Sequence, residues 1–170
     1  MRWTVADALS AIRIPLAIAF LVWDDARARL VLLGAAAASD LLDGTIARRI
    51  GASRLGAVID PVADKLFMAS AFLVVLLSGR LEPFEIVGVL LRDIVATVAF
   101  AITAISGKAA AIPARLGGKA VTVGQVLTLA AFLLHSPYLR PMAWATAAVA
   151  LYAIWDYQRA ASGQAKRLGE

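Results

Sequence analysis

Four aspartates within 25 residues are the side chains of this sequence best suited to chemistry. Asp40 and Asp43 are three positions apart, and Asp60 and Asp64 are four apart. On a helix, either spacing puts both carboxylates on one face. Carboxylate oxygens are the ligands that hard divalent cations prefer, and two such ions are a common arrangement for phosphate chemistry. The spacing therefore predicts that Asp40, Asp43, Asp60 and Asp64 hold hard divalent cations such as Mg²⁺, Mn²⁺ or Ca²⁺, with two ions expected and Mg²⁺ or Mn²⁺ as the expected metal.

The residues beside these aspartates also suit a phosphate-bearing substrate. Gly44 follows Asp43 directly and leaves the backbone open to a ligand, and Ala47 is small and lies one turn further on. Arg48 can bind phosphate oxygens through two parallel hydrogen bonds. Gly56 leaves room near the start of the next expected helix. A plainer interpretation, with Asp60 as a helix cap before a proline, explains that residue alone.

These carboxylates must be carried by helices of a very apolar chain. Of 170 residues, 61% are hydrophobic and 17% are charged, whereas soluble domains average about 45–50% and 25%. Six apolar stretches approach the roughly 20 residues that span a bilayer. We expect an all-α integral membrane protein, a single domain over residues 1–170, whose six transmembrane helices form one bundle with a polar cavity at the cytoplasmic side. The expected helices cover residues 8–23, 30–48, 58–78, 84–106, 119–135 and 141–157.

Composition also excludes several kinds of protein and site. The chain has no cysteine, so disulfides and thiolate sites are excluded, and its single histidine excludes a histidine pair. High hydrophobicity argues against disorder. The net charge of +5 accompanies an apolar excess, so the expected partner is an anionic lipid bilayer and not nucleic acid.

Basic residues predict the topology, because they concentrate on the cytoplasmic side of membrane proteins. Ten lie at the termini and in or at the edges of the second and fourth joins between expected helices, and four lie in the other joins. We therefore expect a multi-pass protein of the cell membrane, with both termini and the active site cytoplasmic. We also expect the first apolar segment to be retained and not cleaved as a signal peptide. The ten are Arg2, Arg48, Arg49, Arg54, Lys108, Arg115, Lys119, Arg159, Lys166 and Arg167.

The order of the cluster resembles the signature of the CDP-alcohol phosphatidyltransferases: Asp-x2-Asp-Gly-x2-Ala-Arg, then eight residues, then Gly-x3-Asp-x3-Asp. Seven residues, not eight, separate Arg48 from Gly56, and this difference leaves both aspartate pairs intact. The local sequence from Asp60 to Lys65 is most similar to that of phosphatidylglycerophosphate synthases. The matching residues are Asp40, Asp43, Gly44, Ala47, Arg48, Gly56, Asp60 and Asp64.

The resemblance implies metal-dependent transfer of a phosphatidyl group from CDP-diacylglycerol to an alcohol, with release of CMP, in phospholipid biosynthesis. It implies that the four aspartates bind the metals and that Asp64 is also the general base for the acceptor hydroxyl. It also implies a homodimer. The residues it assigns to the CDP group are Asp40, Asp43, Gly44, Ala47, Arg48, Gly56 and Asp60.

The acceptor expected from the resemblance is glycerol 3-phosphate. Cardiolipin synthases that use phosphatidylglycerol share the local sequence and are the alternative, together with other CDP-alcohol phosphotransferases. A phosphorylated acceptor needs a cationic pocket, which Arg92, Arg115 and Lys119 could form. Two of them have plainer roles, because Arg92 could form an internal ion pair with Asp93 and Lys119 could simply set topology.

Two further stretches resemble family sequences. Asp7 to Arg13 looks like a degenerate form of the family's N-terminal Asn-x-Leu-Thr-x-x-Arg, so Ser10 and Arg13 face either the donor or the membrane interface. The stretch from Gly118 to Thr122, with Gln125, resembles one near the fifth helix of phosphatidylglycerophosphate synthases.

Two functions of other classes remain open: a divalent-cation transporter and an inactive scaffold. Transport favours acidic residues at mid-membrane in broken helices. The expected cluster lies instead at one side, beside Arg48 and Gly44, which favours phosphate chemistry.

Overall fold

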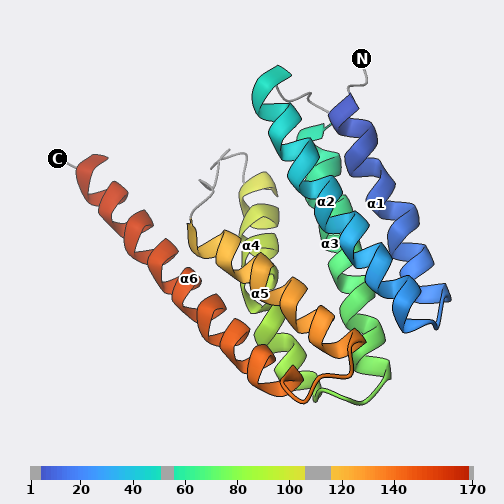
Figure 1. Cartoon of the computed structure of the whole chain (residues 1–170). Coiled ribbons are helices and arrows are strands. Elements are labelled where there is room, and N and C mark those ends of the chain that lie inside the picture. Colours follow the sequence, from blue (N-terminus) through green and yellow to red (C-terminus); the bar gives the residue numbers. More distant parts are fainter. Residues whose placement is uncertain (1–4, 51–55, 106–115, 169–170) are drawn as a thin grey trace. The chain divides into compact units, whose positions relative to one another are not determined.

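The computed structural model describes residues 5–50, 56–105 and 116–168, and most of them form six helices. Side chains are described throughout these ranges except at 5–7, 9, 43–50, 56–61, 100, 103–105, 116 and 160–168. The expected all-α fold of six helices is confirmed, and α6 continues past its expected end at residue 157. The helices are α1 (Val5–Val22), α2 (Ala26–Ile50), α3 (Gly56–Leu77), α4 (Pro83–Ile105), α5 (Leu116–Leu133) and α6 (Leu139–Leu168) (Figure 1).

The chain divides into two compact units. Unit 1 contains α1, α2 and α3 with residues 132–136, and unit 2 contains α4, α6 and the rest of α5. The expectation of one domain over residues 1–170 stays a prediction.

Residues at the turns determine where several helices begin and end. Asp25 caps α2, because its Oδ2 accepts a hydrogen bond of 2.7 Å from the N–H of Ala28. Gly79, in the turn after α3, has a φ of 68°, which glycine adopts without strain. At the start of α4, Glu85 Oε2 accepts a hydrogen bond of 2.8 Å from the N–H of Glu82, with Pro83 at the first helical position.

In unit 1, α1 packs against both α2 and α3. The rings of Phe20 and Phe67 meet edge to face, with centroids 5.6 Å apart. Small buried residues such as Ala17 and Ala36 allow the helices to approach closely. Within this unit the N-terminal end of α1, the C-terminal end of α2 and the N-terminal end of α3 lie at the same end (Figure 1). That end carries the aspartate cluster.

In unit 2, α4, α5 and α6 meet through small residues. Val121 of α5 packs with Ala150 and Ala153 of α6 in a buried cluster. A Cβ placed on Gly88 of α4 would lie 3.1 Å from the Cβ of Ala147 on α6. The close approach of these helices therefore depends on glycine and alanine at the contacts.

Many large apolar side chains remain exposed on the helices, with Val22, Val31 and Leu77 each at least 70% exposed. Over the parts of the helices that the structure describes, no stretch combines the length and the hydropathy of a membrane span. The transmembrane spans and the cytoplasmic polar cavity expected from the sequence stay predictions.

Candidate active site

The four aspartates of the cluster lie on two helices of unit 1. Asp40 and Asp43 belong to the C-terminal half of α2, and Asp60 and Asp64 lie near the start of α3. The side chains of Asp43 and Asp60 are outside the described residues. Among the side chains that are described, no three aspartate, glutamate or histidine residues gather as a metal site. Convergence of all four carboxylates therefore stays a prediction.

The signature residues between the aspartates are also beyond what the structure describes in side-chain detail. The backbone places Gly44, Ala47 and Arg48 on the last turns of α2, and Gly56 is the first residue of α3. Their assignment to the CDP group stays a prediction.

Asp40 is held by a buried arginine of α1. Nη2 of Arg13 lies 3.4 Å from Oδ1 of Asp40, and the Asp40 side chain is 51% exposed. Nε of Arg13 donates to Oγ of Ser39 at 3.1 Å, and that hydroxyl donates to the carbonyl of Ala36 at 2.9 Å. Arg13 and Ser10 are almost fully buried, which does not fit their interpretation as interfacial residues. Arg13 instead reaches the first carboxylate of the cluster.

Asp64, the expected general base, is half-buried on α3, as is its neighbour Lys65. Asp64 also interacts with other residues. A half-buried carboxylate remains accessible to a substrate, and its role as a base stays a prediction.

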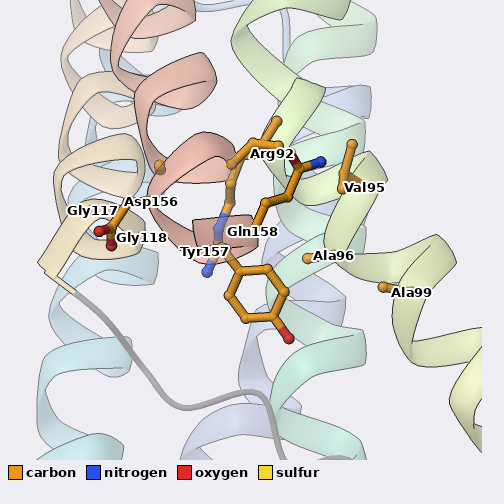
Figure 2. A pocket seen from close by; sticks show the side chains of 11 residues that line it. Arg92, Val95, Ala96, Ala99, Gly117, Gly118, Asp156, Tyr157 and Gln158 are labelled. Carbon is orange, nitrogen blue, oxygen red and sulfur yellow. The ribbon is translucent and has the colours of Figure 1, made fainter. Parts of the chain in front are cut away.

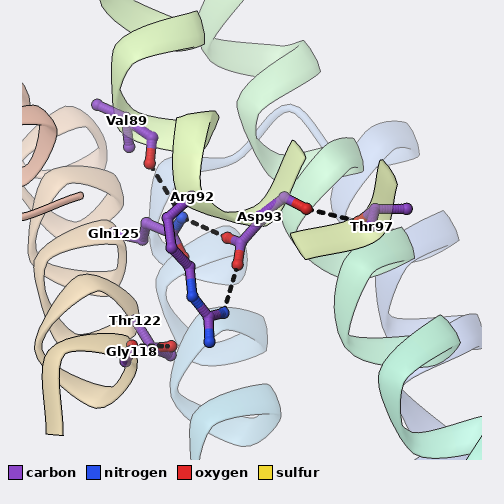
Figure 3. Close-up of polar contacts among 7 residues, drawn as sticks. All are labelled: Val89, Arg92, Asp93, Thr97, Gly118, Thr122 and Gln125. Carbon is purple, nitrogen blue, oxygen red and sulfur yellow. Dashed lines mark hydrogen bonds and ion pairs between the residues drawn. The ribbon is translucent and has the colours of Figure 1, made fainter. Parts of the chain in front are cut away.

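A second polar group lies in unit 2 around Asp93 of α4 (Figure 3). Oδ1 of Asp93 accepts a hydrogen bond of 2.8 Å from Nη1 of Arg92, and Oδ2 accepts one of 2.6 Å from Nε2 of Gln125. The same amide donates to the carbonyl of Val89 at 3.1 Å. The ion pair considered for Arg92 is thus confirmed. Because both oxygens of Asp93 are bound, the carboxylate fixes Arg92 and ties α4 to α5.

Arg92 lies against a glycine of α5. A Cβ on Gly118 would be 2.6 Å from Nη2 of Arg92, closer than real Cβ contacts. The absence of a side chain at position 118 therefore provides the space that the guanidinium occupies.

Arg92 also lines a pocket between α4, α5 and α6 of unit 2, with an empty volume of about 860 Å³ including its open mouth (Figure 2). Besides Arg92, the α4 wall is apolar, with Val95, Ala96 and Ala99. The α6 wall adds the polar side chains of Asp156, Tyr157 and Gln158. The pocket combines one cation (Arg92), one carboxylate (Asp156), further hydrogen-bonding groups and an apolar wall.

Of the other two residues expected around an acceptor phosphate, the structure describes Lys119 alone. Lys119 is exposed on the first turn of α5 and is not among the pocket residues. Arg115 lies outside the described residues. Of the two cations that the structure describes, Arg92 lines this pocket and Lys119 does not.

The sequence did not predict the contacts of Arg13 with Ser39 and Asp40, or the hydrogen bond between Gln125 and Asp93. Gln125 is 1% exposed, and its spacing of seven from Gly118 places both on one face of α5. A polar residue inside an apolar helix was the available signal, but it does not name its partner.

Comparison with known proteins identifies the family. Residues 3–155 match the family model described as CDP-alcohol phosphatidyltransferase. A Mycobacterium tuberculosis (strain H37Rv) protein named "Putative cardiolipin synthase" is 32% identical over 166 residues, which cover 91% of this chain and 79% of that protein. The "Probable phosphatidylglycerophosphate synthase" of the same strain is 34% identical over 104 residues, 61% of this chain and 48% of that protein. The Bacillus subtilis (strain 168) protein named CDP-diacylglycerol--glycerol-3-phosphate 3-phosphatidyltransferase is 27% identical over 136 residues, 75% of this chain and 69% of that protein. With its signature residues on α2 and α3 and a family match over nearly its whole length, the chain belongs to the CDP-alcohol phosphatidyltransferase family.

Proposed function

We propose that this enzyme transfers the phosphatidyl group of CDP-diacylglycerol to glycerol 3-phosphate. A hydroxyl oxygen of the acceptor forms a bond with the phosphorus of the phosphatidyl group. The bond from that phosphorus to the oxygen that becomes part of CMP breaks, and CMP leaves. Asp64 takes the proton of the attacking hydroxyl.

The donor site in this proposal is the polar end of unit 1. Asp40, Asp43, Asp60 and Asp64 would hold divalent cations, and an all-carboxylate donor set suits Mg²⁺ or Mn²⁺. Such ions, when bound, polarise a diphosphate and neutralise the leaving group. The half-exposed carboxylate of Asp40 supports this assignment, because it is accessible to a ligand.

The CDP group would meet the same end of unit 1. Its expected contacts, besides three of the aspartates, are Gly44, Ala47, Arg48 and Gly56. The arginine would hydrogen-bond phosphate oxygens, and the small residues would let the nucleotide approach the helix backbones.

The acceptor site in this proposal is the pocket of unit 2. The observation that supports it is Arg92, whose guanidinium is fixed by Asp93 and lines the pocket. A guanidinium binds phosphate oxygens well, and the polar groups of Asp156 and Gln158 could hydrogen-bond the glycerol hydroxyls. Arg115 and Lys119 would add positive charge.

The second candidate acceptor is phosphatidylglycerol, which would make the enzyme a cardiolipin synthase. The apolar wall of the pocket, formed by Val95, Ala96 and Ala99, favours an acceptor that carries acyl chains. A lipid acceptor and a water-soluble one can be separated by experiment.

We further propose that the enzyme lies in the cell membrane as a homodimer, with its active site on the cytoplasmic side. The high hydrophobic content and the exposed apolar side chains of the helices support contact with lipid. The excess of basic residues at the termini and around the second and fourth joins supports the orientation.

The test is release of CMP by the purified protein in lipid nanodiscs containing CDP-diacylglycerol. Each reaction adds Mg²⁺ or Mn²⁺ and one acceptor: glycerol 3-phosphate, phosphatidylglycerol, glycerol or inositol phosphate. CMP release that requires glycerol 3-phosphate supports the proposal, and release that requires phosphatidylglycerol selects the second candidate. Failure of every acceptor, together with Mn²⁺ uptake into sealed vesicles, would indicate the transporter.

Arg92→Gln tests the acceptor site, with Arg140→Gln as its control. Arg140 is also an arginine of unit 2 and lies 3.7 Å from Glu85, but it does not line the pocket. We expect Arg92→Gln to raise the KM for glycerol 3-phosphate about tenfold, which corresponds to the loss of roughly 1.4 kcal/mol. Arg140→Gln should leave this KM unchanged. Equal effects of the two variants would contradict the assignment.

A further inference from the structure

Arg13 is a cation in the interior of unit 1. Its side chain is 2% exposed, and it lies on α1 among apolar neighbours such as Ala17. A charge is buried at high cost unless it is paired and hydrogen-bonded. The partners of this one include Ser39 and Asp40, two consecutive residues of α2.

One edge of the guanidinium holds both partners. Nε and Nη2 are the two nitrogens on that edge, and they contact Ser39 Oγ at 3.1 Å and Asp40 Oδ1 at 3.4 Å. The Ser39 hydroxyl donates its hydrogen bond to the carbonyl of Ala36, so its oxygen is oriented to accept a hydrogen bond from Arg13. The contact therefore fixes the rotation of α2 about its axis at Asp40.

We propose that Arg13 is a positioning residue that sets the orientation of the Asp40 carboxylate before a divalent cation binds. This inference rests on the proposed function, in which Asp40 is a metal ligand. The 3.4 Å contact is made to Oδ1, and the side chain is half exposed, so the carboxylate can still reach a cation. Groups that hydrogen-bond a metal-binding carboxylate commonly change metal affinity by about 10–100-fold.

The sign of the effect separates positioning from simple charge neutralisation. A positive charge 3.4 Å from the carboxylate repels a second cation. If Arg13 acted only as a counter-ion, its removal would strengthen metal binding. If it positions the carboxylate, its removal weakens metal binding.

The test is binding of Mn²⁺ alone to the purified protein in nanodiscs, measured as free Mn²⁺ by electron paramagnetic resonance. We expect Arg13→Gln to weaken binding about 10–100-fold. Arg13→Lys can still donate a hydrogen bond to Asp40 but loses the forked edge that also holds Ser39, so it should recover part of the affinity relative to Arg13→Gln. This second variant also covers the case in which Arg13→Gln does not fold.

Arg29→Gln is the matched control. Arg29 also ties α2 to α1, through Nε to the carbonyl of Phe20 at 3.0 Å, but it lies in the first turn of α2, far along the helix from the aspartates. It should leave Mn²⁺ affinity within twofold of the unmodified protein, since its contact does not include Asp40.

Two comparisons decide the outcome. Asp40→Asn should weaken Mn²⁺ binding, and adding Arg13→Gln to it should cause little further loss, because the arginine acts through this carboxylate. If Arg13→Gln binds Mn²⁺ as tightly as the unmodified protein or more tightly, while Asp40→Asn binds it more weakly, the positioning role of Arg13 is wrong and the metal role of Asp40 stands. If Asp40→Asn binds Mn²⁺ normally, the metal role of Asp40 is wrong, and the role of Arg13 fails with it.

Discussion

Gly124→Ala should drive α5 and α6 apart in unit 2. A Cβ at this position would lie 2.7 Å from Oγ1 of Thr146 and 3.0 Å from its Cγ2. Thr146 is buried, and its hydroxyl donates to the carbonyl of Met142 at 2.8 Å and contacts the hydroxyl of Thr128 at 3.2 Å. The threonine cannot turn away without losing these bonds. The helices must therefore separate by about 0.7 Å for the closest pair to reach an ordinary contact of 3.4 Å.

Two opposing terms set the size of this effect. Forcing extra atoms into a packed core costs about 1–3 kcal/mol. Replacing glycine by alanine within a helix returns about 0.5–1 kcal/mol. Gly34→Ala on α2 isolates the second term, because a Cβ there meets nothing within 4 Å. The two variants should differ by the overpacking term of about 1–3 kcal/mol, and each kcal/mol shifts Tm by about 2–4 °C in a protein of this size.

The assay is thermal unfolding in one detergent, followed by helical ellipticity. We expect Gly34→Ala to raise Tm and Gly124→Ala to give a Tm about 2–12 °C below it. In a Thr146→Ala background, where Oγ1 and Cγ2 are gone, the cost of Gly124→Ala should fall by at least half. If Gly124→Ala raised Tm as much as Gly34→Ala does, the close contact between α5 and α6 would be refuted.

Three further predictions concern the site and its supports. Gly118→Ala places a Cβ 2.6 Å from Nη2 of Arg92, so we expect the guanidinium to leave its place and the KM for glycerol 3-phosphate to rise about tenfold. The Tm should change little, because the far end of an arginine moves easily. An unchanged KM would argue against Arg92 as an acceptor residue. Asp64→Asn should abolish CMP release while metal-dependent CDP binding stays measurable by calorimetry, since an amide cannot take the proton; full turnover would remove Asp64 from the role of base. Glu85→Ala removes the acceptor for the N–H of Glu82 and should lower the free energy of unfolding, measured by urea titration, by about 1–2 kcal/mol. Glu85→Gln keeps a capping acceptor and should cost less than half of that. Equal losses would mean that the ion pair with Arg140, and not the cap, provides the stability.

The sequence predicted the helices well because the signals that form a helix and those that end it are both local in the sequence. Apolar runs of helical length are separated by polar joins, and the start of α3, α4 and α5 falls within three residues of expectation. The apolar pattern predicts the start of α2 at residue 30, whereas the helix begins at Ala26. Arg27 and Arg29 made that turn look like a polar join, but Asp25 caps the helix at Ala26.

Contacts between helices could not be predicted in the same way. Arg13 and Ser39 are 26 residues apart, and Gln125 and Asp93 are 32 apart. Periodicity places each residue on a face of its own helix, but it does not specify which neighbour that face meets or at what height. The signature from Asp40 to Asp64 could be recognised because the spacing of its aspartates along the chain itself indicates a metal and phosphate site. The convergence of the four carboxylates in space stays a prediction.

The space at Gly118 also limits how relatives of this enzyme can diverge. The arginine on α4 occupies the volume that a side chain at position 118 would fill. A long cation at position 92 and glycine at position 118 should therefore change together among homologous sequences, with larger residues at 118 appearing only where 92 is short. Such paired variation would mark, from sequences alone, which members of the family keep a fixed guanidinium at this pocket.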